Sequence, residues 1–174
     1  MLTTLYLGDD ANTTDKILYA KNGDTNLPFL AYDESENEWV FSNDGTTSAA
    51  IGSNVVTGAI NFIIDGGGST ITTGIKGSIQ IPFGATITSV TLLADQTGSI
   101  VIDICKDTYA NYEPTNADSI TSSTPPTISS SNKSTDSTLT SWTTSVTAGD
   151  ILRFNVDSIT TLQRVTVSIG YSRT

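Results

Sequence analysis

Histidine is absent from the 174-residue sequence, and Cys105 is the single cysteine. Without histidine, the chain cannot build a Ser-His-Asp or Cys-His catalytic unit or an imidazole metal site. One cysteine excludes an internal disulfide bond and a thiolate zinc cluster. Cys105 follows the apolar run 100–102, and we expect it to be a small buried side chain. The sequence therefore predicts a protein that is not an enzyme and needs no cofactor or metal ion.

Basic residues are scarce as well. Charged residues make up 15% of the chain, with 8 Lys and Arg against 18 Asp and Glu, so the net charge is −10. Binding to nucleic acid or to an anionic membrane needs clustered basic residues, so we expect neither partner. Residues 1–54 hold nine acids and two lysines, a net charge of −7, whereas the rest of the chain has a net charge of −3. This imbalance either serves solubility or suits a basic surface or a cation.

Long apolar runs are missing too. The longest has four residues, far short of a membrane span, and the N-terminus shows no secretion signal. We therefore expect the protein to be made in the cytoplasm and to stay in solution. No stretch of useful length has a helical period.

Thr and Ser are abundant, with 30 and 21 residues, and Thr favours strands. Apolar and polar residues alternate in several stretches, as they do in half-buried antiparallel strands. Turn signals such as Gly66-Gly67-Gly68 separate these stretches. The sequence predicts an all-β fold, with an antiparallel β-sandwich or jelly roll over residues 55–174. The predicted strands lie within 60–64, 75–83, 90–92, 100–104, 152–156 and 165–171.

Residues 106–137 contain little apolar sequence and predict a long loop, and loops of this length are often functional. Tyr109 and Tyr112 lie in this segment. They could present aromatic surface to a partner, or they could pin the loop to the sandwich. Both interpretations remain open at this stage.

Residues 1–54 predict a separate small module. The stretches 17–20, 29–32 and 38–41 predict a meander of three strands, followed by a linker at 46–54. About fifty residues bury little surface alone, so the module must pack against something else. We expect it to serve attachment or oligomerisation through Phe29, Tyr32, Trp39 and Phe41.

Other chemistry has weak support. Asp103 and Asp107 are carboxylates four residues apart, a poor signal for glycoside hydrolysis. The acidic turn 33–38 offers oxygen ligands for a hard cation, but its spacing matches no EF-hand, and a solvated turn explains it as well. Gly66-Gly67-Gly68 lies between strands, so it is no phosphate-binding loop.

Two sets of short motifs carry a resemblance to a known family. The first comprises Lys21-Asn22-Gly23-Asp24 through Pro28, Tyr32-Asp33, the run 39–45 and Ile51-Gly52. The second comprises Ile79-Gln80-Ile81-Pro82, the run 102–107, Tyr109-Ala110-Asn111-Tyr112 and the run 148–152. The first set resembles the N-terminal module of phage fibre and head-decoration proteins, and the second resembles the C-terminal β-domain of phage virion proteins.

The resemblance implies a structural protein of the virion, made in the cytoplasm of a bacterial host. It also implies a homotrimer, since fibre and decoration proteins are often trimers. The chain is short for a tail fibre, which favours a capsid decoration or head-fibre protein bound to the major capsid protein or another virion protein. A tail-associated protein that binds a host surface glycan through Tyr109 and Tyr112 is the alternative. A cellular carbohydrate-binding module is a third, less favoured hypothesis.

Overall fold

The structure is a computed structural model in which the chain divides into two compact units, Met1–Asn54 and Val55–Thr174. It describes five strand segments of the first unit, 5–9, 16–20, 29–33, 38–42 and 49–50, and the continuous stretch 55–173 of the second. In the first unit, side chains are described for 29–31 and 39–41 alone.

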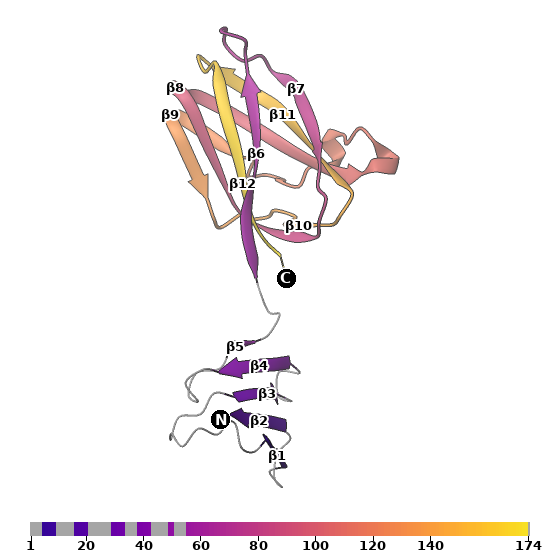
Figure 1. The fold of residues 1–174 in the computed structure, drawn as a ribbon. Coiled ribbons are helices and arrows are strands. Elements are labelled where there is room, and N and C mark those ends of the chain that lie inside the picture. The colour runs from indigo at the N-terminus through magenta and orange to yellow at the C-terminus, as the bar shows by residue number, and fades with distance from the viewer. Residues whose placement is uncertain are drawn as a thin grey trace. The chain divides into compact units, whose positions relative to one another are not determined.

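The second unit is built from antiparallel strands (Figure 1). Two short 3-10 turns, η1 (Tyr109–Asn111) and η2 (Asn116–Asp118), are the helical elements of the described residues. The strands are β6 (Val56–Asp65), β7 (Gly74–Gln80), β8 (Ala85–Thr108), β9 (Thr127–Asp136), β10 (Ser145–Val146), β11 (Asp150–Thr160) and β12 (Arg164–Arg173).

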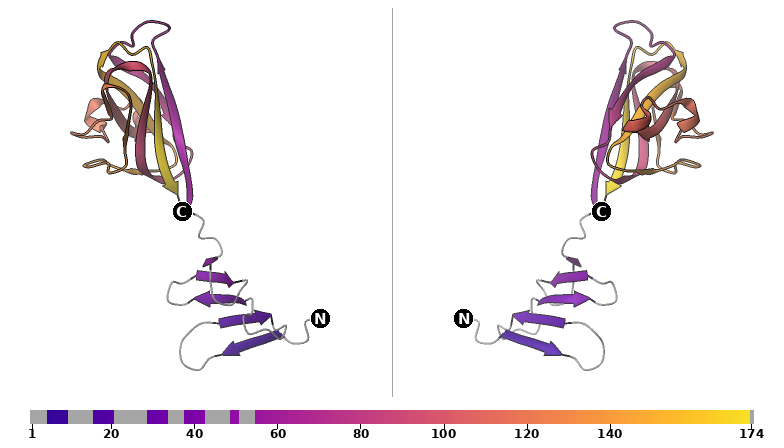
Figure 2. Two further views of the ribbon diagram at one scale, coloured as in Figure 1. Left: turned by 90° about the vertical axis from the view of Figure 1, so that its left-hand side faces the viewer. Right: turned by 90° about the vertical axis from the view of Figure 1, so that its right-hand side faces the viewer.

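These strands form the two layers of a jelly roll. The first half of the unit pairs with the second half in reverse order: β6 with β12, β7 with β11, and the two halves of β8 with the two halves of β9. One layer contains β6, β12, the first half of β8 and the second half of β9. The other contains β7, β11, the second half of β8 and the first half of β9. The views in Figure 2 show the two layers facing each other. This arrangement confirms the predicted all-β sandwich.

Apolar side chains from both layers fill the space between them. Ile100, Ile102 and Ile104 are completely buried, as their alternation predicts. Phe62 of β6 stacks on Phe154 of β11, with ring centroids 4.1 Å apart and planes within 5°. This contact joins the edge of one layer to the other layer. Burial of such side chains is the main source of stability for a chain with few charges.

The apolar pattern of 75–83 is broken in the middle. Gly77 lies opposite Phe154 with φ +141, and the register of β7 against β11 shifts there. This bulge places Ile75 opposite Asn155, on the outer face, where Ile75 is exposed. The shared parity of Ile75, Ile79 and Ile81 predicts that all three lie on the buried face, and this prediction is wrong for Ile75. The sequence alternates as expected, but the extra residue of the bulge turns Ile75 to the opposite face of the strand.

The stretches 90–92 and 100–104 belong to one strand, whereas the sequence predicted two. β8 runs for 24 residues and bends near Gly98, where its pairing with β9 shifts register. A Cβ at Gly98 would lie 2.5 Å from Oγ1 of Thr161 and 2.6 Å from the carbonyl oxygen of Thr160. The glycine is required because another chain segment crosses close to the bend, not because it forms a turn.

The predicted loop 106–137 is also wrong in extent. Thr108 ends β8, and Thr127–Asp136 is strand β9, so the connecting segment is 109–126. β9 consists mainly of Ser, Thr, Asn and Lys, and Ile128 is its one fully buried side chain. Its strand conformation depends on backbone pairing with β8, and polar residues are typical of edge strands.

The first unit is an antiparallel meander of five strands, where three were predicted. The strands β1 to β5 pair in chain order. The first and last of them lie outside the stretches predicted as strands, and Ala49–Ala50 falls within the predicted linker. The strands are β1 (Leu5–Asp9), β2 (Lys16–Ala20), β3 (Phe29–Asp33), β4 (Glu38–Ser42) and β5 (Ala49–Ala50).

Candidate functional site

Trp39 and Phe41 form an apolar surface on β4 of the first unit. Successive side chains of a strand point to opposite faces, so these two share one face and Val40 has the other. Trp39 and Phe41 are each 50% exposed, whereas Val40 and its partner Ala31 are buried. Leu30 is paired with Phe41 and adds to the exposed face.

The other two predicted residues behave differently. Phe29 alternates with Leu30 on β3, so it lies on the face of the buried Ala31 and not beside Trp39. Tyr32 is paired with Trp39 in register, but its side chain lies outside the described residues. Of the predicted set, the structure therefore brings Trp39 and Phe41 together and separates Phe29 from them.

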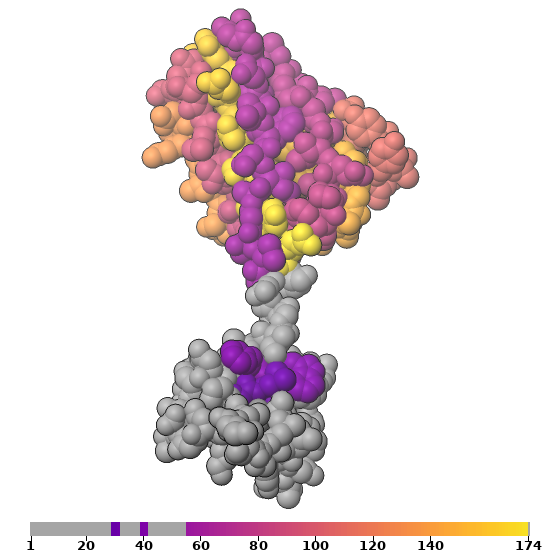
Figure 3. Space-filling view, in the orientation of Figure 1, coloured from indigo at the N-terminus to yellow at the C-terminus, as the bar shows by residue number. Residues whose placement is uncertain are grey.

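Tyr109 and Tyr112 lie at the two ends of η1, which projects from the side of the second unit (Figure 3). They are 73% and 61% exposed. The N–H of Tyr112 donates to the carbonyl of Tyr109 at 3.3 Å, and residues three apart in such a turn lie on the same side of it. The tyrosines do not pin the loop to the sandwich, so of the two open interpretations the structure leaves that of an exposed aromatic surface.

Polar contacts, missed by the sequence analysis, hold this loop against the sheet. Asp103 lies on the outer face of β8, and its Oδ1 accepts hydrogen bonds from Ser119 Oγ and Thr121 Oγ1, both at 2.6 Å. Thr121 is completely buried. The backbone N–H of Ile120 also donates to the carbonyl of Ile104 at 2.9 Å. Ser119 also forms an antiparallel β-bridge with Cys105, so this part of the loop extends the sheet by one short segment beside β8.

Arg153 of β11 is the second anchor of the loop. It is 5% exposed, and its Nη2 donates to Oδ1 of Asn116 at 2.6 Å and to Sγ of Cys105 at 3.3 Å. Among the described residues, ion pairs are formed by Lys106 with Asp150 and by Arg164 with Asp65, so no carboxylate pairs directly with Arg153. Its Nε has no hydrogen-bond partner in the described part of the chain. The buried guanidinium thus depends on Asn116, a residue of the loop.

Cys105 lies between the two anchors. Its Sγ lies 3.5 Å from Oδ2 of Asp103, which the S–H can approach as a weak donor, and it accepts from Arg153. Burial, opposed by the hydrogen bond from Arg153 and aided by the charge of Asp103, raises the pKa of the Cys105 thiol to about 11. A thiol that is buried and stays protonated is a poor nucleophile. The prediction that Cys105 is buried is confirmed.

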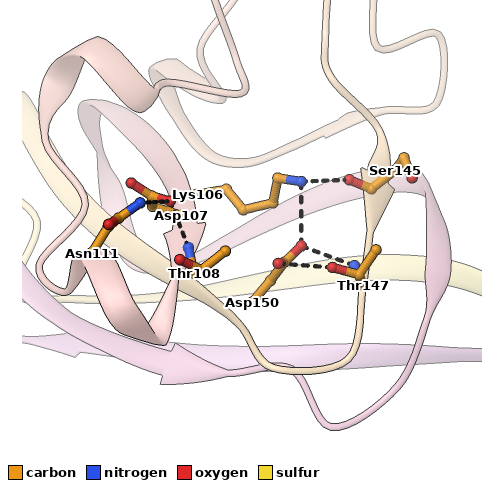
Figure 4. A network of polar contacts seen from close by, with 7 residues as sticks. All are labelled: Lys106, Asp107, Thr108, Asn111, Ser145, Thr147 and Asp150. Carbon is orange, nitrogen blue, oxygen red and sulfur yellow. Dashed lines mark hydrogen bonds and ion pairs between the residues drawn. The ribbon is translucent and has the colours of Figure 1, made fainter.

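A further network fixes the base of the loop (Figure 4). Lys106 Nζ lies 3.2 Å from Oδ2 of Asp150, and it also donates to the carbonyl of Ser145 at 3.0 Å. Asp150 accepts from the N–H and the hydroxyl of Thr147 at 2.8 and 2.9 Å. Burial alone would raise the pKa of Asp150, but the bonds from Thr147 and Lys106 outweigh it, and the pKa lies below its ordinary value. The interactions of the folded protein therefore favour the ionised form of Asp150.

Asp107 completes the base of the loop. Its Oδ1 accepts from the N–H of Thr108 at 2.6 Å and from Nδ2 of Asn111 at 3.1 Å. Asn111 belongs to η1, so this carboxylate orients the turn that carries the tyrosines. Asp103 and Asp107 thus both have structural partners.

Other predicted features give no site. Within the described residues, no group of three or more acidic or cysteine side chains could hold a metal ion. Residues 34–37 of the acidic turn lie outside the described residues, so the hypothesis that this turn binds a cation stays untested. No helix in the described part of the chain is long and apolar enough to span a membrane.

Comparisons with known proteins identify no family. No protein-family model and no curated protein sequence matches the chain. Among solved structures, a chain from "Structure of infectious bursal disease virus Gx strain" matches with a TM-score of 0.30 and 11% sequence identity. The match covers 91% of this chain and 42% of the viral chain, so this chain spans less than half of that one. A similarity this low says nothing about function.

Proposed function

We propose that the chain is a non-enzymatic structural protein of a bacteriophage particle, a capsid decoration or head-fibre protein bound to the outer surface. The first unit attaches it to the major capsid protein or another virion protein. The jelly roll of the second unit faces solvent. The observation that carries this proposal is the exposed apolar face of Trp39 and Phe41, on a unit of 54 residues.

Size and exposure support attachment through the first unit. A unit this small buries a limited apolar core, and leaving two large aromatic side chains half exposed is costly unless a partner covers them. Aromatic residues are the commonest anchors of protein interfaces. The second unit has a closed core of its own and needs no partner for its stability.

The charge distribution also supports attachment through the first unit. The net charge of −7 on residues 1–54 suits a basic patch on a larger shell. Such complementarity speeds association more than it strengthens the complex, so the aromatic pair should determine affinity. The homotrimer implied by the resemblance to fibre and decoration proteins stays a prediction, and light scattering of the purified chain tests it.

A separate observation supports a second candidate function, the binding of a glycan. Tyr109 and Tyr112 are exposed on one side of a turn that is held by Asp107 and, through the rest of the loop, by Arg153 and Asp103. Exposed aromatic faces on a rigid loop are suited to stacking on sugar rings and to hydrogen bonding through the hydroxyl groups. A tail-associated protein that binds a host glycan would use this surface.

Mass spectrometry of purified particles of the encoding virus tests the proposal. A decoration protein is present in a copy number comparable to that of the major capsid protein, whereas a tail protein is present in a few copies. Absence of the chain from purified particles would overturn both candidates. A Tyr109→Ala/Tyr112→Ala variant that loses binding to host cells, in a chain present in few copies, would favour the second.

A further inference from the structure

The outer edge of β6 is an unprotected strand edge. β6 pairs with β12 through ten consecutive residues with no shift of register, and within residues 55–173 no strand pairs with its other side. Its alternate N–H and C=O groups therefore point away from the sheet without a strand partner. In Figure 3 the atoms of β6 form a continuous column beside those of β12. Such an edge is a template for another strand.

The composition of β6 offers no protection against pairing. The strand has no Lys, Arg, Glu or Pro, and Asp65 at its end is its single charge. Val56 is half exposed, and Ile63 is 60% exposed on the outer face. An edge that must stay unpaired normally carries a charge, a proline or a bulge in its middle.

The other edges of the same unit have these devices. β7 has Lys76 followed by the bulge at Gly77. β9 has Lys133, and its register against β8 shifts twice. β10 is two residues long. The lack of protection on β6 is thus specific to that strand and not a general property of this domain.

We propose that the β6 edge pairs with β6 of a second copy of this chain, antiparallel about a two-fold axis. A row of unpaired N–H and C=O groups is complementary to the edge of another β-strand, so we expect a strand to bind there. The alternating pattern of β6 suits antiparallel pairing with β6 of a second copy. Antiparallel pairing centred near Ile60 and Asn61 places residues of like parity opposite each other, so inner faces meet inner faces. Asp65 then lies near the start of the partner strand and away from the partner's Asp65. Two four-stranded layers become one continuous layer of eight.

The pairing also covers the exposed apolar side chain. With the axis at Asn61, Ile63 lies opposite Ala59 of the second copy, a small residue that leaves space for it. With the axis at Ile60, Ile63 lies opposite Thr57. In both registers Ile63 gains a neighbour across the new strand pair. This association is independent of the one proposed for residues 1–54.

Cysteine cross-linking of the full chain tests the proposal. Under mild oxidation, Asn61→Cys alone, or an equimolar mixture of Ala59→Cys and Asn61→Cys chains, forms a disulfide-linked dimer. Leu93→Cys is the matched control, since Leu93 is exposed on the outer face two strands from the edge. The unaltered chain, with its buried Cys105, is the blank.

A charge introduced at the edge of β6 provides a second test of the proposal. Asn61→Lys places the two lysines opposite each other with the axis at Asn61 and diagonally across the strand pair with the axis at Ile60. In both registers it raises the dimer dissociation constant by about tenfold or more. Its urea midpoint at low concentration stays that of the unaltered chain, because residue 61 is exposed. Dimers through Leu93→Cys alone would overturn the proposal in favour of face-to-face contact. Failure of every edge cysteine to cross-link would exclude a second copy as the occupant.

Discussion

Arg153 on β11 donates a hydrogen bond to Asn116 in the loop 109–126 at 2.6 Å. The guanidinium is buried and pairs with no carboxylate among the described residues, so the hydrogen bond to the loop offsets part of the cost of burying it. In return, the strand fixes the loop that carries the two exposed tyrosines. This contact is therefore one of those that couple the loop with the exposed tyrosines to the sheet.

We expect Asn116→Ala to destabilise the second unit by about 1–2 kcal/mol, because it removes the acceptor of a buried charged donor that water can only partly replace. Urea unfolding measures the change, and amide exchange should rise across 109–119. Asn111→Ala is the control, since its contact to Asp107 is exposed, and it should change stability by less than about 0.5 kcal/mol. Equal effects of the two variants would contradict the anchoring role of Arg153.

Cys105 should resist thiol reagents in the native protein. Its side chain is buried and its pKa is raised to about 11, so little thiolate exists at neutral pH. We expect its reaction with a disulfide reagent near pH 8 to be at least about a hundredfold slower in buffer than in concentrated urea. Reaction of the folded protein at the rate of the unfolded chain would show that the loop does not stay closed over the sheet.

Asp150 should make stability depend on pH. Its pKa is lower in the folded state than in the unfolded state, so its contribution is present above its unfolded value of about 3.9 and is lost as the pH falls through its folded value. Asp150→Asn should be less stable at about pH 7 by about 1–3 kcal/mol, since Lys106 and Thr147 lose a charged acceptor. Urea unfolding at about pH 7 and pH 3 should show a smaller loss of stability on acidification in the variant.

Asp95 and Asp118 also have lowered pKa values. The loss of stability of the unaltered chain on acidification therefore has contributions from several carboxyl groups. The comparison of Asp150→Asn with the unaltered chain isolates the contribution of this one residue. An identical pH dependence in both proteins would mean that the Lys106 network does not stabilise the folded state.

The bend of β8 should not tolerate a side chain at Gly98. Gly98→Ala places a Cβ against the crossing segment at Thr160 and Thr161, and we expect a loss of about 1–3 kcal/mol from strain. Gly84→Ala is the matched control, because the nearest atom to its new Cβ is 3.9 Å away. Thermal unfolding of both variants measures the difference. A neutral Gly98→Ala would contradict the tight crossing at the bend.

Periodicity predicted the parts of the fold that depend on burial. Ile100, Ile102 and Ile104 point inward and Asp103 outward, as their alternation indicates. It failed for β9, because nearly every residue of that strand is polar and backbone pairing alone defines it. It also failed at Gly77, since a bulge reverses the face without changing the sequence pattern. Both failures are long-range effects that a local pattern does not contain.

The candidate sites were predicted in part. Aromatic residues in a polar stretch were enough to single out Tyr109 and Tyr112, and in an apolar strand to single out Trp39 and Phe41. The anchors of the tyrosine loop were missed, because Arg153 alternates with Leu152 and Phe154 in the sequence and so predicts a solvent-facing position. That a loop from elsewhere in the chain covers this face follows from the topology. Only the three-dimensional arrangement shows the contact with Asn116.

The most direct test of the account is a binding measurement with the full chain on capsids of the encoding virus that lack it. We predict that Trp39→Ala/Phe41→Ala lowers affinity at least about tenfold, because aromatic anchors dominate such interfaces. We predict that Tyr109→Ala/Tyr112→Ala binds like the unaltered chain, since the proposal assigns attachment to the first unit and these side chains belong to the second. Normal binding by the first variant together with loss of binding by the second would contradict attachment through residues 1–54.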